Sequence, residues 1–442
     1  MGGLVPGRTL PRRALRRAGR LPLAAARRAA LVLLRTLVRR RPAPGPSRRP
    51  RVRILLRHAY GTGGTIRTVL ATAGHLARDH DVEIVSLLKE KDASFFPVPP
   101  GVAVSFADDR TVPPGRAARL VGRLPSLLFS VGGSPATRET LWTDLRVARL
   151  LLAGDADVLV GTRPALNLLV AEVAPPGTVT IGQDHMNLRA YPPGTRAAIR
   201  RAYPRLTALA VLTEASRAEY AAALSGTAVR IVRIPNALAT PPGAPSRRTA
   251  KVVLAAGRLT RQKGFDLLLR AYEPLAAEHP DWTLRIFGSG PHRARLAKRI
   301  AERGLAGRVE LNPRTADLPG EMERAAVYVL SSRFEGMPMV VLEAMSKGLP
   351  VVAFDCPTGP AEMISHESDG LIVPPKDVAG LTAALRRLMT DADLRDELGE
   401  RARASVRAYD PEWIVPRWTD LIDELLAPRR RRVRTPVPGP SR

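Results

Sequence analysis

The chain has 442 residues, of which 45% are apolar and 25% are charged, a composition typical of a globular protein large enough for two domains. The single cysteine, Cys356, excludes an internal disulfide and a cysteine-based metal cluster, and it favours a reducing compartment. Most of the net charge of +28 lies in the tails, because residues 1–50 contain fourteen Arg and residues 428–442 contain six, with no Asp or Glu in either segment.

Residues 1–50 form a basic, partly amphipathic extension. The longest uninterrupted apolar run, residues 29–34, is far shorter than the roughly 20 residues that span a bilayer. On a helical projection the apolar side chains share an arc of about 100°, and five arginines lie on a neighbouring arc. The apolar arc consists of Leu23, Ala26, Ala30, Leu33, Leu34 and Leu37. The basic arc consists of Arg20, Arg27, Arg28, Arg35 and Arg39. This pattern predicts that residues 10–41 lie on an anionic membrane surface, with a solvated basic extension or a misassigned start codon as the alternatives. Residues 42–50 have the composition of a linker.

From residue 51 the chain alternates strands and helices, which predicts a first α/β domain over residues 51–240. Strands are expected at residues 51–57, 82–88, 157–161, 178–183, 207–213 and 229–238. The glycines at 61, 63 and 64 do not complete G-x-G-x-x-G, because residue 66 is Ile, and this disfavours a dinucleotide-dependent dehydrogenase. The strand at 178–183 places His185 at its carboxyl end, where the imidazole either hydrogen-bonds a ligand or serves as a structural hydrogen-bonding group.

A linker at 241–249 leads to a second α/β domain over residues 250–408. Its first strand, residues 251–257, is followed by Arg258 and Lys263, and a guanidinium and an ammonium just past a strand end are suited to a diphosphate. Further strands are expected from residues 284 and 309. Residues 377–407 are expected to be helical, residues 409–427 to form a last helix, and residues 428–442 to be a basic disordered tail.

The stretch from 331 to 373 reads as strand, loop, helix, strand and loop. Glu335 and Gly336 make the turn, Pro338 suits the first helical position, and Glu343 lies inside the helix. Eight positions on one helix separate two carboxylates by roughly 12 Å in rise, so they cannot share a proton. They instead bracket an extended ligand, such as a sugar joined to a nucleoside through a diphosphate, with the amides of Met339 and Val340 between them. A capping glutamate and a solvated helical glutamate are the alternative interpretation.

The pattern S-x-R-x-E-G-x-P-x-x-x-x-E-A-M-x-x-G-x-P-V-V in this stretch resembles the donor site of the retaining GT-B glycosyltransferases of family 4. FDCPTGPAEMI and SDGLIVPPKD resemble the branch that builds bacterial cell-surface glycopolymers such as teichoic acids and capsules. The resemblance extends over about residues 51–427. It implies an α/β fold of two Rossmann-like, doubly wound domains facing a central cleft, with the last helix crossing back to the first domain.

The resemblance also implies roles for individual residues. Glu335 and His185 are expected to be the catalytic residues that orient the sugar, and G-R-L-x-x-x-K-G matches the family's phosphate-binding pair, Arg258 and Lys263. Phosphate of the leaving group is expected to assist the acceptor hydroxyl. The remaining donor-binding residues expected are Gly336, Met337, Met339, Val340, Glu343, Gly63 and Gly64. Pro313 stands where the family usually has Gly, near the place expected for the nucleobase.

We therefore predict a retaining hexosyltransferase that uses a nucleotide-sugar, a UDP-sugar, and a cell-surface polysaccharide, teichoic-acid-like or lipid-linked acceptor. No cofactor or metal is expected, because the two D-x-D matches, at 155–157 and 391–393, precede a strand and open a helix. The expected location is cytoplasmic, peripheral on the inner face of the plasma membrane. The alternatives are a GT-B epimerase or phosphorylase and a nucleic-acid-binding protein acting through its basic tails. With 4% aromatic residues and no reader motif, no nucleic acid is expected as a partner.

Overall fold

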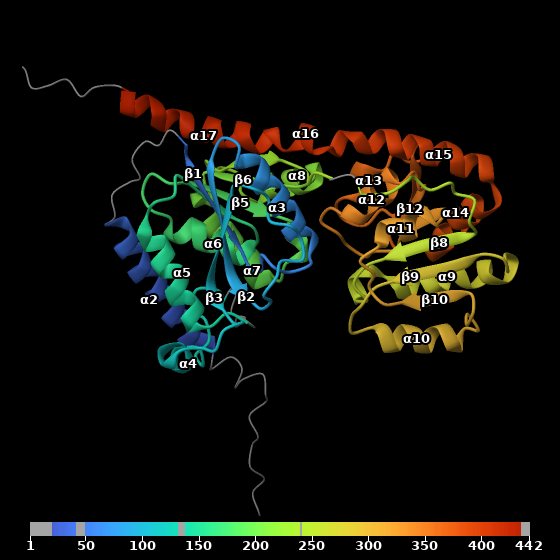
Figure 1. The fold of residues 1–442 in the computed structure, drawn as a ribbon, viewed down its shortest axis with the longest axis horizontal. Helices are drawn as coiled ribbons and strands as arrows, with labels where there is room; N and C mark the ends of the chain where they lie inside the picture. The colour runs from blue at the N-terminus through green and yellow to red at the C-terminus, as the bar shows by residue number, and fades with distance from the viewer. Residues whose placement is uncertain (1–19, 41–48, 131–137, 239–240, 435–442) are drawn as a thin grey trace, which may run out of the picture.

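The computed structural model of the protein describes residues 20–40, 49–130, 138–238 and 241–434, which form two α/β domains (Figure 1). The first contains a seven-stranded parallel sheet of order β3-β2-β1-β4-β5-β6-β7. Its strands are β1 (Arg51–Leu56), β2 (Asp81–Lys89), β3 (Val102–Asp109), β4 (Val158–Gly161), β5 (Val179–Asp184), β6 (Ala208–Val211) and β7 (Arg230–Arg233). The expected linker at 42–50 is described only for its last two residues, and the expected tail is not described beyond residue 434.

The central strands of the first sheet are short apolar runs, because helices cover both faces of a parallel sheet and bury both sets of side chains. Every residue of β4 and β6 is buried. The covering helices are α3 (Gly64–Leu76), α4 (Arg116–Val121), α5 (Leu141–Ala153), α6 (Pro164–Val173), α7 (Pro193–Ala202) and α8 (Glu214–Ala223).

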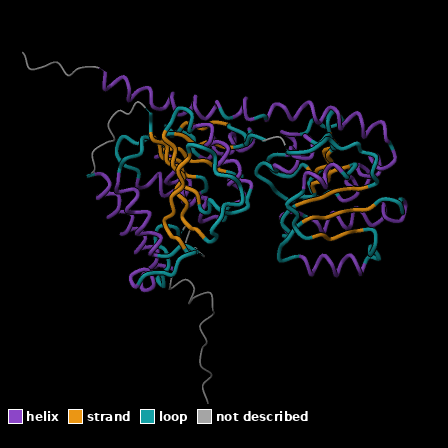
Figure 2. Tube along the Cα trace, in the orientation of Figure 1, coloured by secondary structure: helices purple, strands orange, loops and turns teal. Residues whose placement is uncertain are grey.

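The second domain repeats this design with a six-stranded parallel sheet of order β10-β9-β8-β11-β12-β13 (Figure 2). Its strands are β8 (Val252–Ala256), β9 (Thr283–Phe287), β10 (Val309–Asn312), β11 (Val327–Leu330), β12 (Val351–Phe354) and β13 (Gly370–Val373). Its helices are α9 (Phe265–Glu278), α10 (Arg293–Glu302), α11 (Leu318–Glu323), α12 (Met339–Ser346), α13 (Pro360–Met363), α14 (Val378–Thr390) and α15 (Ala392–Ser405).

Strand order reverses at one place in each sheet, between β1 and β4 in the first and between β8 and β11 in the second. In open parallel sheets, ligands bind beyond the carboxyl ends of the strands at such a reversal. Both reversals contribute loops to the same interdomain cleft. The expectation of two Rossmann-like domains facing a central cleft is therefore confirmed.

The helix expected near the N-terminus is present as α2 (Arg20–Arg39), but it packs against α5 and α6. Leu31, Leu34 and Val38, spaced three and four residues apart, enter the core of the first domain. Leu33 and Leu37, members of the predicted lipid-facing arc, are exposed. The helical projection predicted one apolar arc, whereas the structure divides the apolar side chains between the protein core and solvent.

The linker is fixed to the second domain by a buried lysine. The ammonium of Lys347, 2% exposed, donates hydrogen bonds to the carbonyls of Pro242 and Ala244 and pairs with Glu323 at 2.8 Å. Each buried donor on this ammonium thus has an acceptor, as a buried charge requires.

The chain returns to the first domain through α16 (Pro411–Ile414) and α17 (Pro416–Arg434), which continue from α15 so that the three helices lie along one side of the two domains (Figure 1). Ile414, Trp418 and Ile422 pack into the core formed by β1 and α3. The predicted crossover helix is confirmed, although it continues past the predicted end at Ala427 to Arg434, since arginine is a good helix former. No helix within the described ranges is both long and apolar enough to cross a bilayer.

We expect Trp418→Ala to lower the free energy of unfolding of the first domain by about 3–5 kcal/mol, because it removes a large side chain from a packed core. Trp418 is 4% exposed, whereas Trp413, on the preceding turn, is 62% exposed. Urea unfolding followed by circular dichroism measures the change, and Trp413→Ala is the matched control, expected to change stability by less than about 0.5 kcal/mol. Equal effects of the two substitutions would contradict the packing of the crossover helix.

Candidate active site

A cleft of about 880 Å³ lies between the two domains. Its walls are the loops that follow β1, β8, β9 and β11, together with the segment after β5 and the first turns of α12. Ten of the eleven predicted site residues line it: Gly63, Gly64, His185, Arg258, Lys263, Glu335, Met337, Met339, Val340 and Glu343. The eleventh, Gly336, lies behind the lining at the junction of the domains.

Glu335 and Lys263 form an ion pair at the centre of the cleft. Lys263 Nζ donates to Glu335 Oε1 at 2.7 Å, and the hydroxyl of Ser332 donates to the same oxygen at 2.6 Å. Glu335 is only 6% exposed, so its charge needs these donors. The lysine expected to bind phosphate is therefore poised beside the glutamate expected to orient the sugar.

The loop between β8 and α9 carries the basic residues and is shaped by Gly264. This glycine has a φ of +66°, and a Cβ at this position would lie 1.9 Å from the carbonyl oxygen of Ser331. The loop therefore requires glycine on two independent grounds. Arg258, on the same loop, is exposed and forms no ion pair with any residue in the described ranges, which leaves its guanidinium available to an anion in the cleft.

Helix α12 points its N-terminus into the cleft. Pro338 is its N-cap rather than its first residue, one position from the prediction, and the amides of Met339 and Val340 belong to the first turn, whose N–H groups have no partner within the helix. Such an N-terminus favours anions. Glu343, one turn further along, is occupied by the first domain: Arg67 from α3 pairs with it at 2.7 Å. Burial raises the pKa of Glu343, and the guanidinium opposes that shift.

Two loops from different domains meet beside Glu335. A Cβ on Gly336 would lie 1.9 Å from the carbonyl oxygen of His185, so only glycine permits this approach. The Asn187 side-chain amide donates to the Glu335 carbonyl at 3.2 Å and to the Thr358 hydroxyl at 3.2 Å. The predicted pair Glu335 and His185 is thus brought together from opposite sides of the cleft.

The imidazole of His185 is neutral at pH 7, because burial lowers its pKa to about 4. Its Nε2 atom is buried and has no hydrogen-bond partner among the described residues. A buried polar atom costs free energy unless a water molecule or a ligand satisfies it. His185 is therefore suited to exchanging a hydrogen bond with a hydroxyl group of a ligand, as a neutral group.

The strand end that carries His185 is held by a cage around Asp184. The hydroxyls of Tyr191, Tyr203 and Tyr220 all donate to this carboxylate. The side-chain amide of Asn167 donates to the hydroxyl of Tyr203 and to the carbonyl of Gln183, each at 3.0 Å. Burial raises the pKa of Asp184 to about 6, and the tyrosine hydrogen bonds act in the opposite direction. The cage fixes the backbone immediately before the imidazole.

Sequence reasoning missed these supporting residues. Asn187 and the three tyrosines stand at no motif spacing, and only their position just after strands or within cleft-facing helices could have suggested them. Arg67, by contrast, completes the arrangement G-G-x-x-R with Gly63 and Gly64, which resembles the family's first glycine loop. Both D-x-D matches have structural partners: Asp155 pairs with Arg53 at 2.8 Å, and Asp391 caps α15 by accepting from the amide of Leu394.

The raised pKa of Asp184 makes folding stability depend on pH. Below its ordinary pKa of 3.8 the carboxyl is protonated in both the folded and the unfolded protein. Above that pH the unfolded chain loses the proton, whereas the folded protein keeps it up to about pH 6 because ionisation would bury a charge. The free energy of unfolding therefore falls as the pH rises through this range. Relative to Asp184→Asn, we expect a decrease of about 2 kcal/mol between about pH 4.5 and pH 7.5. Urea unfolding of both proteins across this range measures it, and a pH-independent difference would contradict the assignment.

Comparison with known proteins places residues 241–405 in the family described as glycosyl transferases group 1. An exopolysaccharide phosphotransferase of Streptomyces coelicolor is 37% identical over 393 residues, which are 86% of this chain and 41% of that protein. The amylovoran biosynthesis glycosyltransferase AmsD of Erwinia amylovora is 35% identical over 171 residues, 39% of this chain and 48% of that protein. The chain thus spans less than half the length of either relative.

Two solved structures share the fold over most of the chain. Sucrose-phosphate synthase of Thermosynechococcus elongatus has a TM-score of 0.69 at 18% identity and covers 86% of this chain and 100% of its own. HepE of Anabaena, in complex with UDP and glucose, has a TM-score of 0.64 at 18% identity, and the match covers 84% of this chain and 99% of the HepE chain. The chain therefore has the GT-B fold, and its residues 241–405 match the family described as glycosyl transferases group 1.

Proposed function

We propose that the protein is a retaining glycosyltransferase that moves a sugar from a nucleotide-sugar, a UDP-sugar, to a hydroxyl of a cell-surface polysaccharide, teichoic-acid-like or lipid-linked acceptor. The observation that carries the proposal is the Lys263–Glu335 ion pair, set between the exposed Arg258 and the N-terminus of α12 and facing His185 across the cleft. Cations and helix amides on one side suit a diphosphate, and neutral or acidic hydrogen-bonding groups on the other suit a sugar.

The donor would bind with its diphosphate at the basic loop after β8. Lys263 would then exchange part of its interaction with Glu335 for phosphate oxygens, while Arg258 supplies a bidentate contact. Glu335 would accept from sugar hydroxyls, and the unpartnered Nε2 of His185 would complete the sugar's hydrogen bonds. Glu343, displaced from Arg67, would hold the nucleoside end.

In the transfer step, the bond between the anomeric carbon and the diphosphate oxygen breaks, and the acceptor oxygen bonds to the same face of that carbon. The acceptor proton passes to the departing phosphate oxygen. Negative charge develops on the diphosphate, where Arg258, Lys263 and the amides of α12 stand, and stabilising it there lowers the barrier. The chain's own groups supply this stabilisation, so the proposed reaction uses no metal.

The names of related proteins support the proposed role in the synthesis of cell-surface polysaccharides. The Erwinia amylovora relative is named for amylovoran biosynthesis, the Streptomyces coelicolor relative for exopolysaccharide, and a poly(ribitol-phosphate) α-N-acetylglucosaminyltransferase of Staphylococcus aureus is 27% identical over 177 residues. The phosphotransferase activity named for the Streptomyces protein belongs to a chain of which this one spans 41%, and it is not part of the proposal.

The proposal is tested by incubating the purified protein with a panel of nucleotide sugars, in EDTA, with and without poly(ribitol phosphate) or a polyprenyl-phosphate-linked glycan. We expect nucleotide release that requires an acceptor, a product whose anomeric configuration by NMR matches that of the donor, and no loss of rate in EDTA. Sugar release or isomerisation without an acceptor would favour the epimerase or phosphorylase alternative, and an inverted product would contradict retention.

Lys263→Ala is expected to lower kcat/KM by about 10- to 150-fold, the effect of losing a charge-assisted interaction of about 1.5–3 kcal/mol with the developing diphosphate charge. Lys263→Arg keeps the cation and should recover part of the activity. Lys251→Ala, which removes an exposed lysine before β8, is the matched control and should leave kcat/KM unchanged. If a folded Lys263→Ala protein turned over at the wild-type rate, the lysine would have no role in donor binding.

A further inference from the structure

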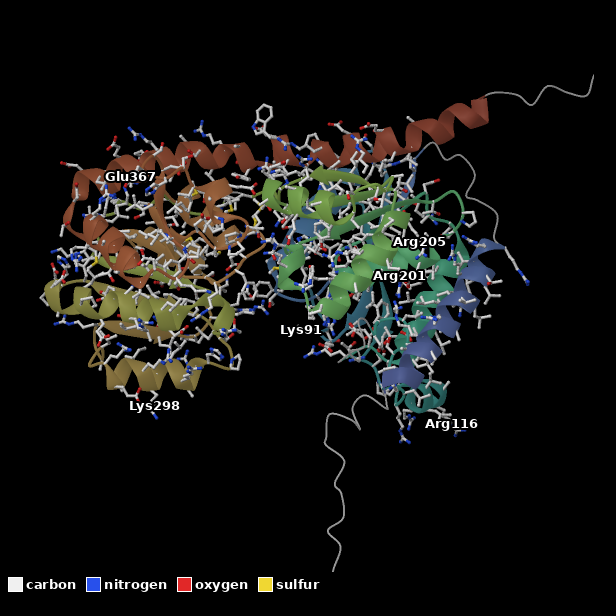
Figure 3. The ribbon with its side chains drawn as sticks, turned by 180° about the vertical axis from the view of Figure 1, so that it is seen from behind. Lys91, Arg116, Arg201, Arg205, Lys298 and Glu367 are labelled. Atoms are coloured by element: carbon white, nitrogen blue, oxygen red, sulfur yellow. The ribbon has the colours of Figure 1, made fainter. Side chains whose placement is uncertain are left out.

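A second cavity, of about 490 Å³, lies away from the cleft, between α2 and α7 on the outer flank of the first domain. Apolar side chains from both helices line part of it, among them Leu23, Leu31 and Ala198. Five arginines line the rest: Arg27, Arg28, Arg35, Arg201 and Arg205. Figure 3 shows Arg201 and Arg205 on this flank, at the opposite end of the molecule from Lys298 on α10.

The positive charge of this arginine groove is not neutralised by the chain. The one acidic side chain in its lining, Glu172, pairs with Arg27 at 3.2 Å and lies 3.9 Å from Arg201. Arg28, Arg35 and Arg205 form no ion pair within the described ranges. The segments that adjoin α2 and Ser130 in the sequence, residues 1–50 and 131–137, contain no Asp or Glu. Within the described ranges, therefore, only Glu172 offers a carboxylate to this groove, and the remaining positive charge is available to an anion from another molecule.

The surface around the groove is unusually apolar. The described residues include ten exposed large apolar side chains, and seven of them lie on α2, α5 and the segment around α4: Val32, Leu33, Leu37, Val112, Leu120, Leu124 and Leu145. Helix α4 has no buried residue at all. Helices α2 and α4 both pack against α5, so the elements that carry these side chains lie on one flank of the domain (Figure 1). Exposed aliphatic side chains gathered in this way mark an interaction surface.

Guanidinium groups beside exposed aliphatic side chains fit one class of partner. Arginine matches phosphate oxygens geometrically, and leucine and valine side chains enter the acyl boundary of a bilayer. A nucleic acid would also supply phosphates, but it would gain nothing from the aliphatic side chains, and the seven exposed residues include no aromatic ring on which a base could stack. We propose that the arginine groove binds the phosphate group of an anionic phospholipid, and that the flank carrying α2 and α4 rests on an anionic bilayer.

The packing of α2 against the first domain makes the arginine groove a part of that domain. Because Leu31, Leu34 and Val38 hold the helix in the core of the first domain, the groove is a rigid part of that domain rather than a flexible arm. The inference goes beyond sugar transfer and does not depend on it, since it concerns a surface that shares no residue with the cleft.

The test uses the full chain and phosphatidylcholine vesicles with and without phosphatidylglycerol. We expect co-sedimentation that requires phosphatidylglycerol and weakens at high salt. Arg201→Glu/Arg205→Glu should lower the partition coefficient by at least roughly 30-fold, since each basic residue near an anionic surface contributes about a factor of five and each new glutamate adds repulsion. Arg295→Glu/Lys298→Glu on α10 makes the same change of charge in the second domain and should have little effect. Equal losses for the two double variants would overturn the proposal, because binding would then follow net charge alone.

A second pair of variants separates the lipid from other polyanions. Val32→Ser/Leu33→Ser removes two exposed apolar side chains without altering charge and should weaken vesicle binding several-fold, with unchanged thermal unfolding. Binding of a duplex RNA by the same proteins is measured in parallel. If Arg201→Glu/Arg205→Glu abolished RNA binding while Val32→Ser/Leu33→Ser left vesicle binding intact, the groove would be a nucleic-acid site and the lipid proposal would be wrong.

Discussion

The close approach of Gly336 to the carbonyl of His185 is the constraint on which the rest of the candidate site depends. It brings the carboxyl edge of one sheet against that of the other at a single point, so that the carboxylate of Glu335 and the imidazole of His185, from separate domains, share one cleft. Asn187 reinforces the contact by donating to the carbonyl of Glu335. Any side chain at residue 336 would force the two loops apart, and the cleft between Glu335 and His185 would lose its geometry.

Both predicted site carboxylates of the cleft are already paired with cations, and this has an energetic consequence. Lys263 neutralises Glu335, and Arg67 neutralises Glu343 across the domain boundary. Removing one member of a buried pair leaves an uncompensated charge, which costs several kcal/mol. A ligand that enters must therefore replace the cation that it displaces, and a nucleoside diphosphate joined to a sugar offers hydroxyls to the carboxylates and phosphates to the cations. The pairing rejects ligands that satisfy only one side.

Much of the fold could be predicted from the sequence, because parallel strands buried on both faces read as apolar runs and the helix between β11 and β12 is bounded by Pro338 and Gly348. The grouping of Arg258, Lys263, Glu335 and His185 was implied by the family resemblance, and the strand ends expected before Arg258, Lys263 and His185 agreed with it. The Asp184 cage could not be predicted, since its three tyrosines come from a segment without periodic spacing and meet only through the packing of α6, α7 and α8. Helix α2 was predicted as a helix, but the face that it buries is decided by contacts with the rest of the first domain. A helical projection of α2 alone does not include those contacts.

The two terminal helices pack into different cores of the first domain. Helix α17 packs Trp418 and Ile422 into one core, beside β1 and α3, and joins the second domain to the first from that side. Helix α2 packs into another core, on the flank farthest from the second domain (Figure 1). If that flank rests on a bilayer, the first domain is held at the surface while the loops after β8 and β11, where we propose that the donor binds, remain in water. Nucleotide-sugar can then reach the second domain without leaving the aqueous phase, and an acceptor attached to the membrane can meet the cleft through the domain that is held there.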